Sequence, residues 1–197
     1  MEETHLNPET PAPKSPLKRA IIPVVIILAV VIGALLLIKA STPQKANVNA
    51  PVADLTEGAE VPNFDLTGLD GRSVPISTFN HKVMMINFWA TWCEACMEEM
   101  PSIVALRDRY APKGFEILAV DVDENPQQVV PAVVQKYQMK FPVFTDKPGT
   151  LAEIFDLHAI PLTVIINHDR KILLVEPGGR DWGGTEVQQL MDKWLAD

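Results

Sequence analysis

Residues 86–101 read INFWATWCEACMEEMP and contain both cysteines of the 197-residue chain, Cys93 and Cys96. The apolar, partly β-branched run from Val83 to Trp89 that leads into them is typical of a buried central strand. From Glu94 to Tyr110, apolar residues recur at helical spacing and would share one broad face. This stretch therefore predicts a strand, a turn and a helix, with the cysteine pair where the helix begins.

The position and spacing of the two cysteines indicate redox chemistry. The first turn of a helix has unpaired N–H groups and the positive end of the helix dipole, which favour a thiolate over a thiol. Two cysteines separated by two residues can also bond to each other, so one sulfur can resolve the mixed disulfide that the other forms. Because the first cysteine of such a motif is the exposed one, we assign Cys93 as the attacking nucleophile and Cys96 as the resolving thiol of a redox-active Cys93–Cys96 disulfide.

Other uses of two cysteines fit the chain less well. A structural zinc site needs four ligands, and the four histidines show no ligand spacing near the cysteines, so zinc shared between two chains is the alternative that stays open. Asp121, Asp123 and Glu124 are spaced loosely like cation ligands, but a solvated loop after a strand is the more typical structure. We therefore expect no metal and no cofactor. The net charge of −8 gives no support to a nucleic-acid partner.

Beyond residue 60 the sequence alternates between strand and helix patterns, which predicts an α/β domain. The expected strands cover residues 64–66, 74–76, 83–89, 115–120, 141–144, 162–166 and 172–175. The expected helices cover residues 94–110, 126–137, 151–157 and 185–195. Asn125 is expected to cap the second of these helices, and Pro131 to kink or shorten it.

The region before this domain has a different composition. Residues 1–19 are polar and rich in proline, which predicts a disordered tail. Residues 20–38, AIIPVVIILAVVIGALLLI, form an unbroken apolar run that would span about 28 Å as a helix, close to the hydrocarbon thickness of a bilayer. The run is longer than the apolar core of a cleaved signal peptide and ends directly at Lys39, so a retained transmembrane signal anchor is favoured over a cleaved one. Residues 39–56 are then a flexible linker and residues 57–197 the globular domain.

Basic residues set the expected orientation of this anchor. Lys14, Lys18 and Arg19 precede the apolar run, against Lys39 and Lys45 after it, so the positive-inside rule leaves the N-terminal tail in the cytoplasm. The predicted protein crosses the inner, cytoplasmic membrane once. Its globular domain would face the periplasm or the cell exterior, an oxidising place where dithiol chemistry has a use.

The quoted stretch resembles the thioredoxin superfamily, and more narrowly its membrane-anchored TlpA/ResA-type branch, with redoxin (AhpC/TSA-like) relatives. The likeness covers residues 57–197. It rests on Phe88 to Cys96, on Pro101 within the following helix, and on Ala159-Ile160-Pro161 ahead of a strand. It implies a thioredoxin-like fold, with a central mixed sheet flanked by helices.

The same resemblance assigns residues around the cysteines. It implies that Pro161 is preceded by a cis peptide bond, which only about 5–6% of X-Pro bonds adopt, and that it packs beside the active site. Trp92 and Ile160 are expected to form the wall of the substrate-binding site together with Pro161.

Acidic residues near the cysteines suggest the direction of the chemistry. Cytoplasmic-type thioredoxins carry a buried Asp where this chain has Asn87, whereas a Glu at the position of Glu99 is characteristic of ResA-like proteins. We expect Glu99 to mediate proton transfer to or from the thiols; the alternative is a plain carboxylate near the start of the helix. Glu94, Glu98 and Glu99 together oppose thiolates, which predicts a reducing rather than an oxidising couple.

The resemblance also implies partners. The leading interpretation is a reductase of protein disulfides that draws electrons from a membrane thiol carrier, with apocytochrome c as the candidate substrate. Many cytochrome-maturation relatives have Glu where this chain has Leu162, which weakens the narrower substrate assignment. A thiol peroxidase is the second hypothesis, although Ile86 and Ala90 stand where peroxiredoxins have Pro and Thr or Ser. A tethered binding module with a structural disulfide is the third.

Overall fold

The computed structural model describes residues 55–196 of the chain. The predicted disordered tail, the apolar run and most of the linker lie outside these residues. Within residues 55–196, no helix is both long and apolar enough to cross a membrane. The anchor therefore stays a prediction from the sequence.

A mixed sheet forms the centre of the described domain. Its strands are β1 (Asp65–Gly68), β2 (Ser73–Pro75), β3 (Val83–Trp89), β4 (Phe115–Asp121), β5 (Val143–Thr145), β6 (Leu162–Asn167) and β7 (Ile172–Pro177). They lie in the order β2-β1-β5-β4-β3-β6-β7. β3, β4 and β5 run parallel, while β6 is antiparallel to β3 and β1 is antiparallel to β5. The predicted α/β architecture with a central mixed sheet is confirmed.

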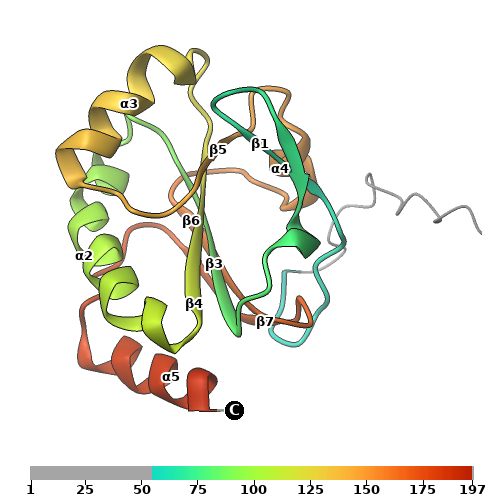
Figure 1. Cartoon of the computed structure of the whole chain (residues 1–197), viewed down its shortest axis with the longest axis vertical. Helices are drawn as coiled ribbons and strands as arrows, with labels where there is room; N and C mark the ends of the chain where they lie inside the picture. Colours follow the sequence, from blue (N-terminus) through green and yellow to red (C-terminus); the bar gives the residue numbers. More distant parts are fainter. Residues whose placement is uncertain (1–54, 197) are drawn as a thin grey trace, which may run out of the picture. The chain divides into compact units, whose positions relative to one another are not determined.

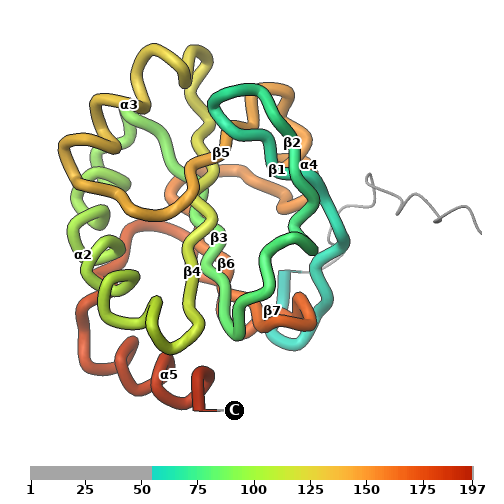
Figure 2. Tube along the Cα trace, in the orientation of Figure 1, coloured from blue at the N-terminus to red at the C-terminus, as the bar shows by residue number. Residues whose placement is uncertain are grey.

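Helices cover both faces of this sheet (Figure 1). They are α2 (Glu94–Tyr110), α3 (Pro126–Tyr137), α4 (Thr150–Ile154) and α5 (Thr185–Ala196). α2, α3 and α5 pack on one face and share a core with the two cysteines, whereas α4 packs on the other. The tube view shows the same division, with α2 and α3 side by side (Figure 2).

The central strand β3 explains why both faces have a core. All seven of its residues are buried. Met85 and Trp89 face the core under α2, and Met84, Ile86 and Phe88 face the opposite core. A strand covered on both faces needs apolar residues at successive positions, which is why this part of the sequence shows an unbroken apolar run instead of alternation.

α3 has the predicted N-cap residue and the predicted bounds. Asn125 is the N-cap residue, but its side chain makes no capping hydrogen bond; its backbone carbonyl accepts from the N–H of Gln128 at 3.0 Å instead. Pro131 does not shorten the helix, which spans the full predicted range. Proline removes the N–H that would bond to the carbonyl four residues earlier, that of Gln127. Because Gln127 and Pro131 are both exposed, water can solvate this carbonyl.

Candidate active site

Cys93 and Cys96 lie at the junction of β3 and α2, as predicted. The chain leaves β3 and turns, and the N–H of Cys93 donates to the carbonyl of Ala90 at 3.2 Å. Cys93 is the N-cap residue of α2, and its Sγ accepts a hydrogen bond from the N–H of Cys96 at 3.2 Å. The two cysteines form a disulfide, with Cα atoms 5.3 Å apart. A sulfur that already accepts an N–H at the start of a helix is well placed to be stabilised as a thiolate.

The two cysteines differ in their access to solvent. Cys93 is 7% exposed, whereas Cys96 is fully buried. An attacking sulfur must reach a partner's disulfide, and a resolving sulfur needs only to reach its neighbour. The greater exposure of Cys93 therefore agrees with its assignment as the attacking sulfur and that of Cys96 as the resolving sulfur.

The predicted wall residues come from two separate segments. The Ile160–Pro161 peptide bond is cis, as the resemblance to the thioredoxin superfamily implies. The carbonyl of Pro161 accepts from the N–H of Gly178 at 2.8 Å, which joins this segment to the loop after β7. Trp92 is 69% exposed, so its indole is available to a partner rather than to the core, while Pro161 is buried and Ile160 half-buried.

The loop after β7 closes against the segment between the cysteines. A Cβ on Gly179 would lie 3.4 Å from the carbonyl oxygen of Ala95 and 3.5 Å from its Cβ. Such a contact is at the tight end of ordinary packing, so glycine lets the loop approach the start of α2 closely. Through Gly178 and Gly179, the loop contacts both Pro161 and the cysteine-bearing turn of α2.

Glu99 is buried and accepts three hydrogen bonds. Oε1 accepts from the side-chain amide of Asn87 at 3.1 Å, and Oε2 accepts from the N–H of Arg180 and the indole N–H of Trp182, each at 3.2 Å. Burial raises the pKa of the Glu99 carboxyl, and the donors of Trp182, Arg180 and Asn87 oppose that rise. Burial has the larger effect, so the pKa of this carboxyl lies above its ordinary value and the proton is held more tightly than in water.

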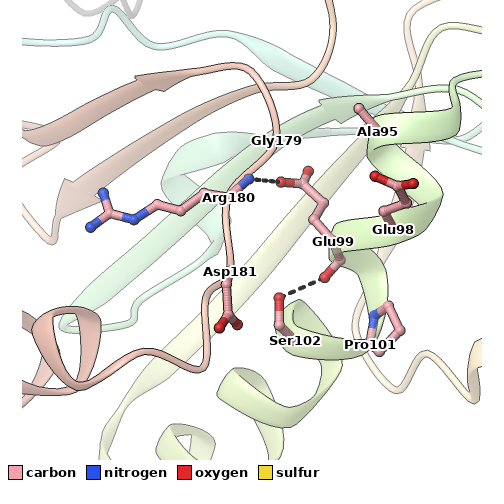
Figure 3. Close-up of a pocket in the computed structure, with 8 residues that line it drawn as sticks. All are labelled: Ala95, Glu98, Glu99, Pro101, Ser102, Gly179, Arg180 and Asp181. Carbon is pink, nitrogen blue, oxygen red and sulfur yellow. Dashed lines mark hydrogen bonds between the residues drawn. The ribbon is translucent and has the colours of Figure 1, made fainter.

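A pocket of about 440 Å³ opens beside Glu99 (Figure 3). It is lined by Ala95, Glu98, Glu99, Pro101, Ser102, Gly179, Arg180 and Asp181. The guanidinium of Arg180 points away from Glu99, and it pairs with Glu176 and, at 3.0 Å, with Glu186. The guanidinium of Arg180 is therefore already paired with other carboxylates and does not neutralise the carboxyl groups at the pocket.

Sequence reasoning missed the loop after β7 as part of the site. No pattern in the sequence assigns a role to Gly178, Gly179, Arg180 or Trp182. Trp182 is fully buried and lies 83 positions after Glu99, its hydrogen-bond partner. Asn87, noted only as a departure from thioredoxin, also donates to the hydroxyl of Thr163 at 3.0 Å and so fixes its amide toward Glu99.

Replacing Glu99 with Gln is expected to change the titration of the thiols. Loss of a carboxylate beside the cysteines lowers the pKa of the Cys93 thiol, and loss of a proton acceptor slows exchange by about tenfold. The pH profile of alkylation by iodoacetamide measures the first effect, and reduction of a protein disulfide by the reduced chain measures the second. An alkylation profile and an exchange rate both equal to those of the unmodified chain would exclude a proton-transfer role.

The solvated loop expected after β4 is found only in part: Glu124 is exposed, but Asp121 belongs to β4 and Asp123 is buried. Asp121 is fully buried and Asp123 is 6% exposed. Asp121 ends β4 in phase with Ile117 and Ala119, which face the core under α2, so its side chain points inward rather than to water. Within residues 55–196, no three His, Cys, Asp or Glu side chains are grouped as metal ligands.

The chain is similar in sequence to a known protein family and to named thiol-disulfide oxidoreductases. The model of the AhpC/TSA family matches residues 58–175. The chain belongs to this family. Thiol-disulfide oxidoreductase ResA of Bacillus thuringiensis subsp. konkukian is 38% identical over 138 residues, which cover 70% of this chain and 76% of that protein. ResA of Bacillus subtilis is 32% identical over 124 residues, covering 63% of this chain and 69% of the relative.

Solved structures agree with the family assignment. A candidate thiol:disulfide interchange protein DsbE from Chlorobium tepidum superposes with a TM-score of 0.65 at 26% identity, covering 72% of this chain and 99% of that one. A thiol:disulfide interchange protein from a Bacteroides species, at 20% identity and a TM-score of 0.60, supports the thioredoxin-like fold. This AhpC/TSA-family chain is thus a thiol–disulfide oxidoreductase with Cys93 and Cys96 at disulfide distance.

Proposed function

We propose that the chain is a membrane-anchored, extracytoplasmic reductase of protein disulfides. The observation that carries this proposal is the placement of the Cys93–Cys96 pair at the start of α2, one helical turn ahead of the buried carboxyl of Glu99, which lines a pocket with further acidic groups. Exposed Glu94 and Glu98 add negative charge on the same turn of the helix. Negative charge disfavours thiolates, and a less stable reduced form gives up its electrons more readily.

The exchange itself moves two electrons from the chain to its substrate. The thiolate of Cys93 attacks one sulfur of the substrate disulfide, the S–S bond of the substrate breaks, and one substrate thiolate leaves. The thiolate of Cys96 then attacks Sγ of Cys93, which releases the second substrate thiolate and closes the Cys93–Cys96 disulfide. The two protons of the dithiol end on the substrate thiols, with Glu99 as the proposed proton carrier.

The proposed location follows from the sequence alone. The apolar run at residues 20–38 would anchor the chain, and the basic residues before it favour a domain on the periplasmic or outer side. In this compartment the oxidised pair needs a membrane thiol carrier to return it to the dithiol state. Apocytochrome c is the proposed substrate, supported by the likeness to ResA-type proteins. Leu162, buried directly after the cis-proline, is the departure that leaves other protein disulfides as substrates.

The reduction potential of the pair tests the proposed direction. In equilibrium with a series of glutathione or dithiothreitol buffers, we expect a potential at or below about −250 mV, near that of thioredoxin. Mass spectrometry of alkylated samples gives the reduced fraction. A potential near about −120 mV, the range of strong dithiol oxidants, would contradict the assignment as a reductase.

Assays of the reduced chain also distinguish the reductase from the two alternatives, a thiol peroxidase and a binding module. The positions three and seven residues before Cys93 are Ala90 and Ile86, both buried and without the hydroxyl or proline of a peroxiredoxin site. Peroxide consumption at rates comparable to protein-disulfide reduction would favour the peroxidase. A reduced chain that reacts with neither substrate would favour the binding module.

A further inference from the structure

The side chain of Asp123 holds Thr91, two residues ahead of Cys93. The backbone N–H of Thr91 donates to Oδ2 of Asp123 at 2.8 Å, and its hydroxyl donates to Oδ1 at 3.0 Å. Asp123 is 6% exposed, so both hydrogen bonds are shielded from water and charge-assisted. They fix the backbone and the side chain of one residue in the turn that presents Cys93.

This contact continues the pairing of β3 with β4 beyond the sheet. The last register pair of the two strands joins Trp89 to Asp121. The N–H of Val122 then donates to the carbonyl of Trp89 at 3.0 Å. One step further, the carboxylate of Asp123 accepts the N–H of Thr91, in the role that a backbone carbonyl has in a longer ladder. The alignment of the strands is thereby carried into the turn.

Other interactions hold mainly the two ends of this turn, because Ala90 and Cys93 are both buried in the core under α2. Within residues 55–196, the backbone hydrogen bond inside the turn is the one from Cys93 to Ala90, at 3.2 Å. Trp92, between Thr91 and Cys93, is 69% exposed and adds little packing. Between the two buried ends, the side-chain contact that holds the middle of the turn is the one from Asp123 to Thr91.

We propose that Asp123 is a positioning residue for thiol–disulfide exchange: by holding Thr91 through two hydrogen bonds, it keeps Sγ of Cys93 at the N–H groups that begin α2. Asp123 acts through Thr91 and not on the sulfur. The inference rests on the proposed exchange chemistry and adds a residue on which its rate depends. If Thr91 is released, Sγ of Cys93 moves away from the N–H of Cys96, which now lies 3.2 Å from it.

Asp123 could act on Cys93 by positioning the turn or by its charge alone, and removing it would shift the pKa of the Cys93 thiol in opposite directions in the two cases. A carboxylate acting only through its charge disfavours the thiolate, so its removal would lower the pKa of the Cys93 thiol. A carboxylate acting through hydrogen bonds keeps an N–H donor on the sulfur, so its removal would raise that pKa. Asn at position 123 separates the two cases, because an amide can accept the N–H of Thr91 and donate to its hydroxyl oxygen without a charge.

The test is a double-mutant cycle in the full chain with Thr91→Val, Asp123→Ala and the pair together. We expect each single variant to slow the reduction of a protein disulfide by about fivefold. We also expect each to shift the pH profile of Cys93 alkylation to higher pH. The double variant should be no slower than the worse single variant, since both remove one contact. Thr91→Ser and Asp123→Asn, which keep the hydrogen bonds, should retain most of the rate.

A buried carboxylate outside the turn provides the matched control. Asp146 accepts the N–H groups of Leu151 and Ala152, at 3.0 and 2.7 Å, at the start of α4. Asp146→Ala is expected to lower the stability of the domain and to leave the alkylation profile in place. Three results would each overturn the proposal: additive effects of the two substitutions on the rate, a shift of the alkylation profile to lower pH, or a Thr91→Val chain that reduces substrate at the full rate. A parent chain without any exchange activity would instead count against the proposed function.

Discussion

The Cys96→Ser variant is expected to accumulate as a covalent adduct with its protein substrates, whereas Cys93→Ser should form none. The expectation follows from the geometry of the pair. Cys93 is the sulfur with access to solvent and stands at the N-cap of α2, while Cys96 is fully buried behind it. Without the second sulfur, the mixed disulfide on Cys93 has no internal thiolate to resolve it.

The adducts are measured by separating the alkylated chain on a non-reducing gel and identifying the bound partner by mass spectrometry. We expect reductase turnover to fall by at least about a thousandfold in both single variants, because each lacks one of the two required sulfurs. The Cys93→Ser variant controls for non-covalent capture. Adducts on Cys93→Ser but not on Cys96→Ser would reverse the assigned roles, and stable chains with unchanged turnover would make the disulfide structural.

Replacing Asp121 with Asn is expected to make the domain more stable at alkaline pH. Burial, together with the adjacent Asp123, raises the pKa of Asp121 from 3.8 to about 8. Its Oδ1 accepts the N–H of Asp123 at 3.2 Å, and its Oδ2 is buried without a partner among the described residues. Ionisation therefore places an uncompensated charge inside the domain.

The direction with pH follows from proton linkage. An acid that holds its proton more tightly in the folded chain than in the unfolded chain makes the free energy of unfolding fall as pH rises. For Asp121 this fall extends from the unfolded value of 3.8 to the folded value of about 8. Asn carries no titratable proton, so the variant lacks this contribution. We expect its advantage to reach on the order of 2 kcal/mol by pH 8, after relaxation around the charge recovers part of the penalty.

Urea unfolding of the reduced full chain at pH 5, 7 and 9, followed by circular dichroism, measures the difference. Asp65→Asn, at the exposed start of β1, removes one charge from the surface and should leave the pH dependence of the parent chain. An Asp121→Asn chain whose free energy of unfolding tracks that of the parent at all three pH values would show that Asp121 is ionised without penalty.

The sequence was most informative where neighbouring residues decide the structure. The strand, turn and helix around Cys93 follow from an apolar run and a helical repeat, and β3 and α2 have the predicted bounds. The cis bond before Pro161 was predicted from the resemblance. The partners of Glu99 could not be predicted in this way, because Arg180 and Trp182 reach it only through the path of the loop after β7.

The burial of Asp121 could have been predicted from the sequence. The expected strand ended at Val120, and one further residue continues the inward phase of Ile117 and Ala119. On the sequence alone, this acidic residue is instead expected in a solvated loop after the strand, where charged side chains usually lie. The contact between Asp123 and Thr91 could not be predicted from the sequence. The two residues are 32 positions apart, and no local pattern links them.

The hydrogen bond between Trp182 and Glu99 places a buried indole in direct contact with the proposed proton carrier. The indole is fully buried, and its N–H donates to Oε2 of Glu99 at 3.2 Å. We expect the proposed gain or loss of a proton at Glu99 to change the fluorescence of Trp182, because the charge would form at an atom that the indole contacts. On this expectation, stopped-flow fluorescence of the unlabelled chain would follow proton transfer during exchange.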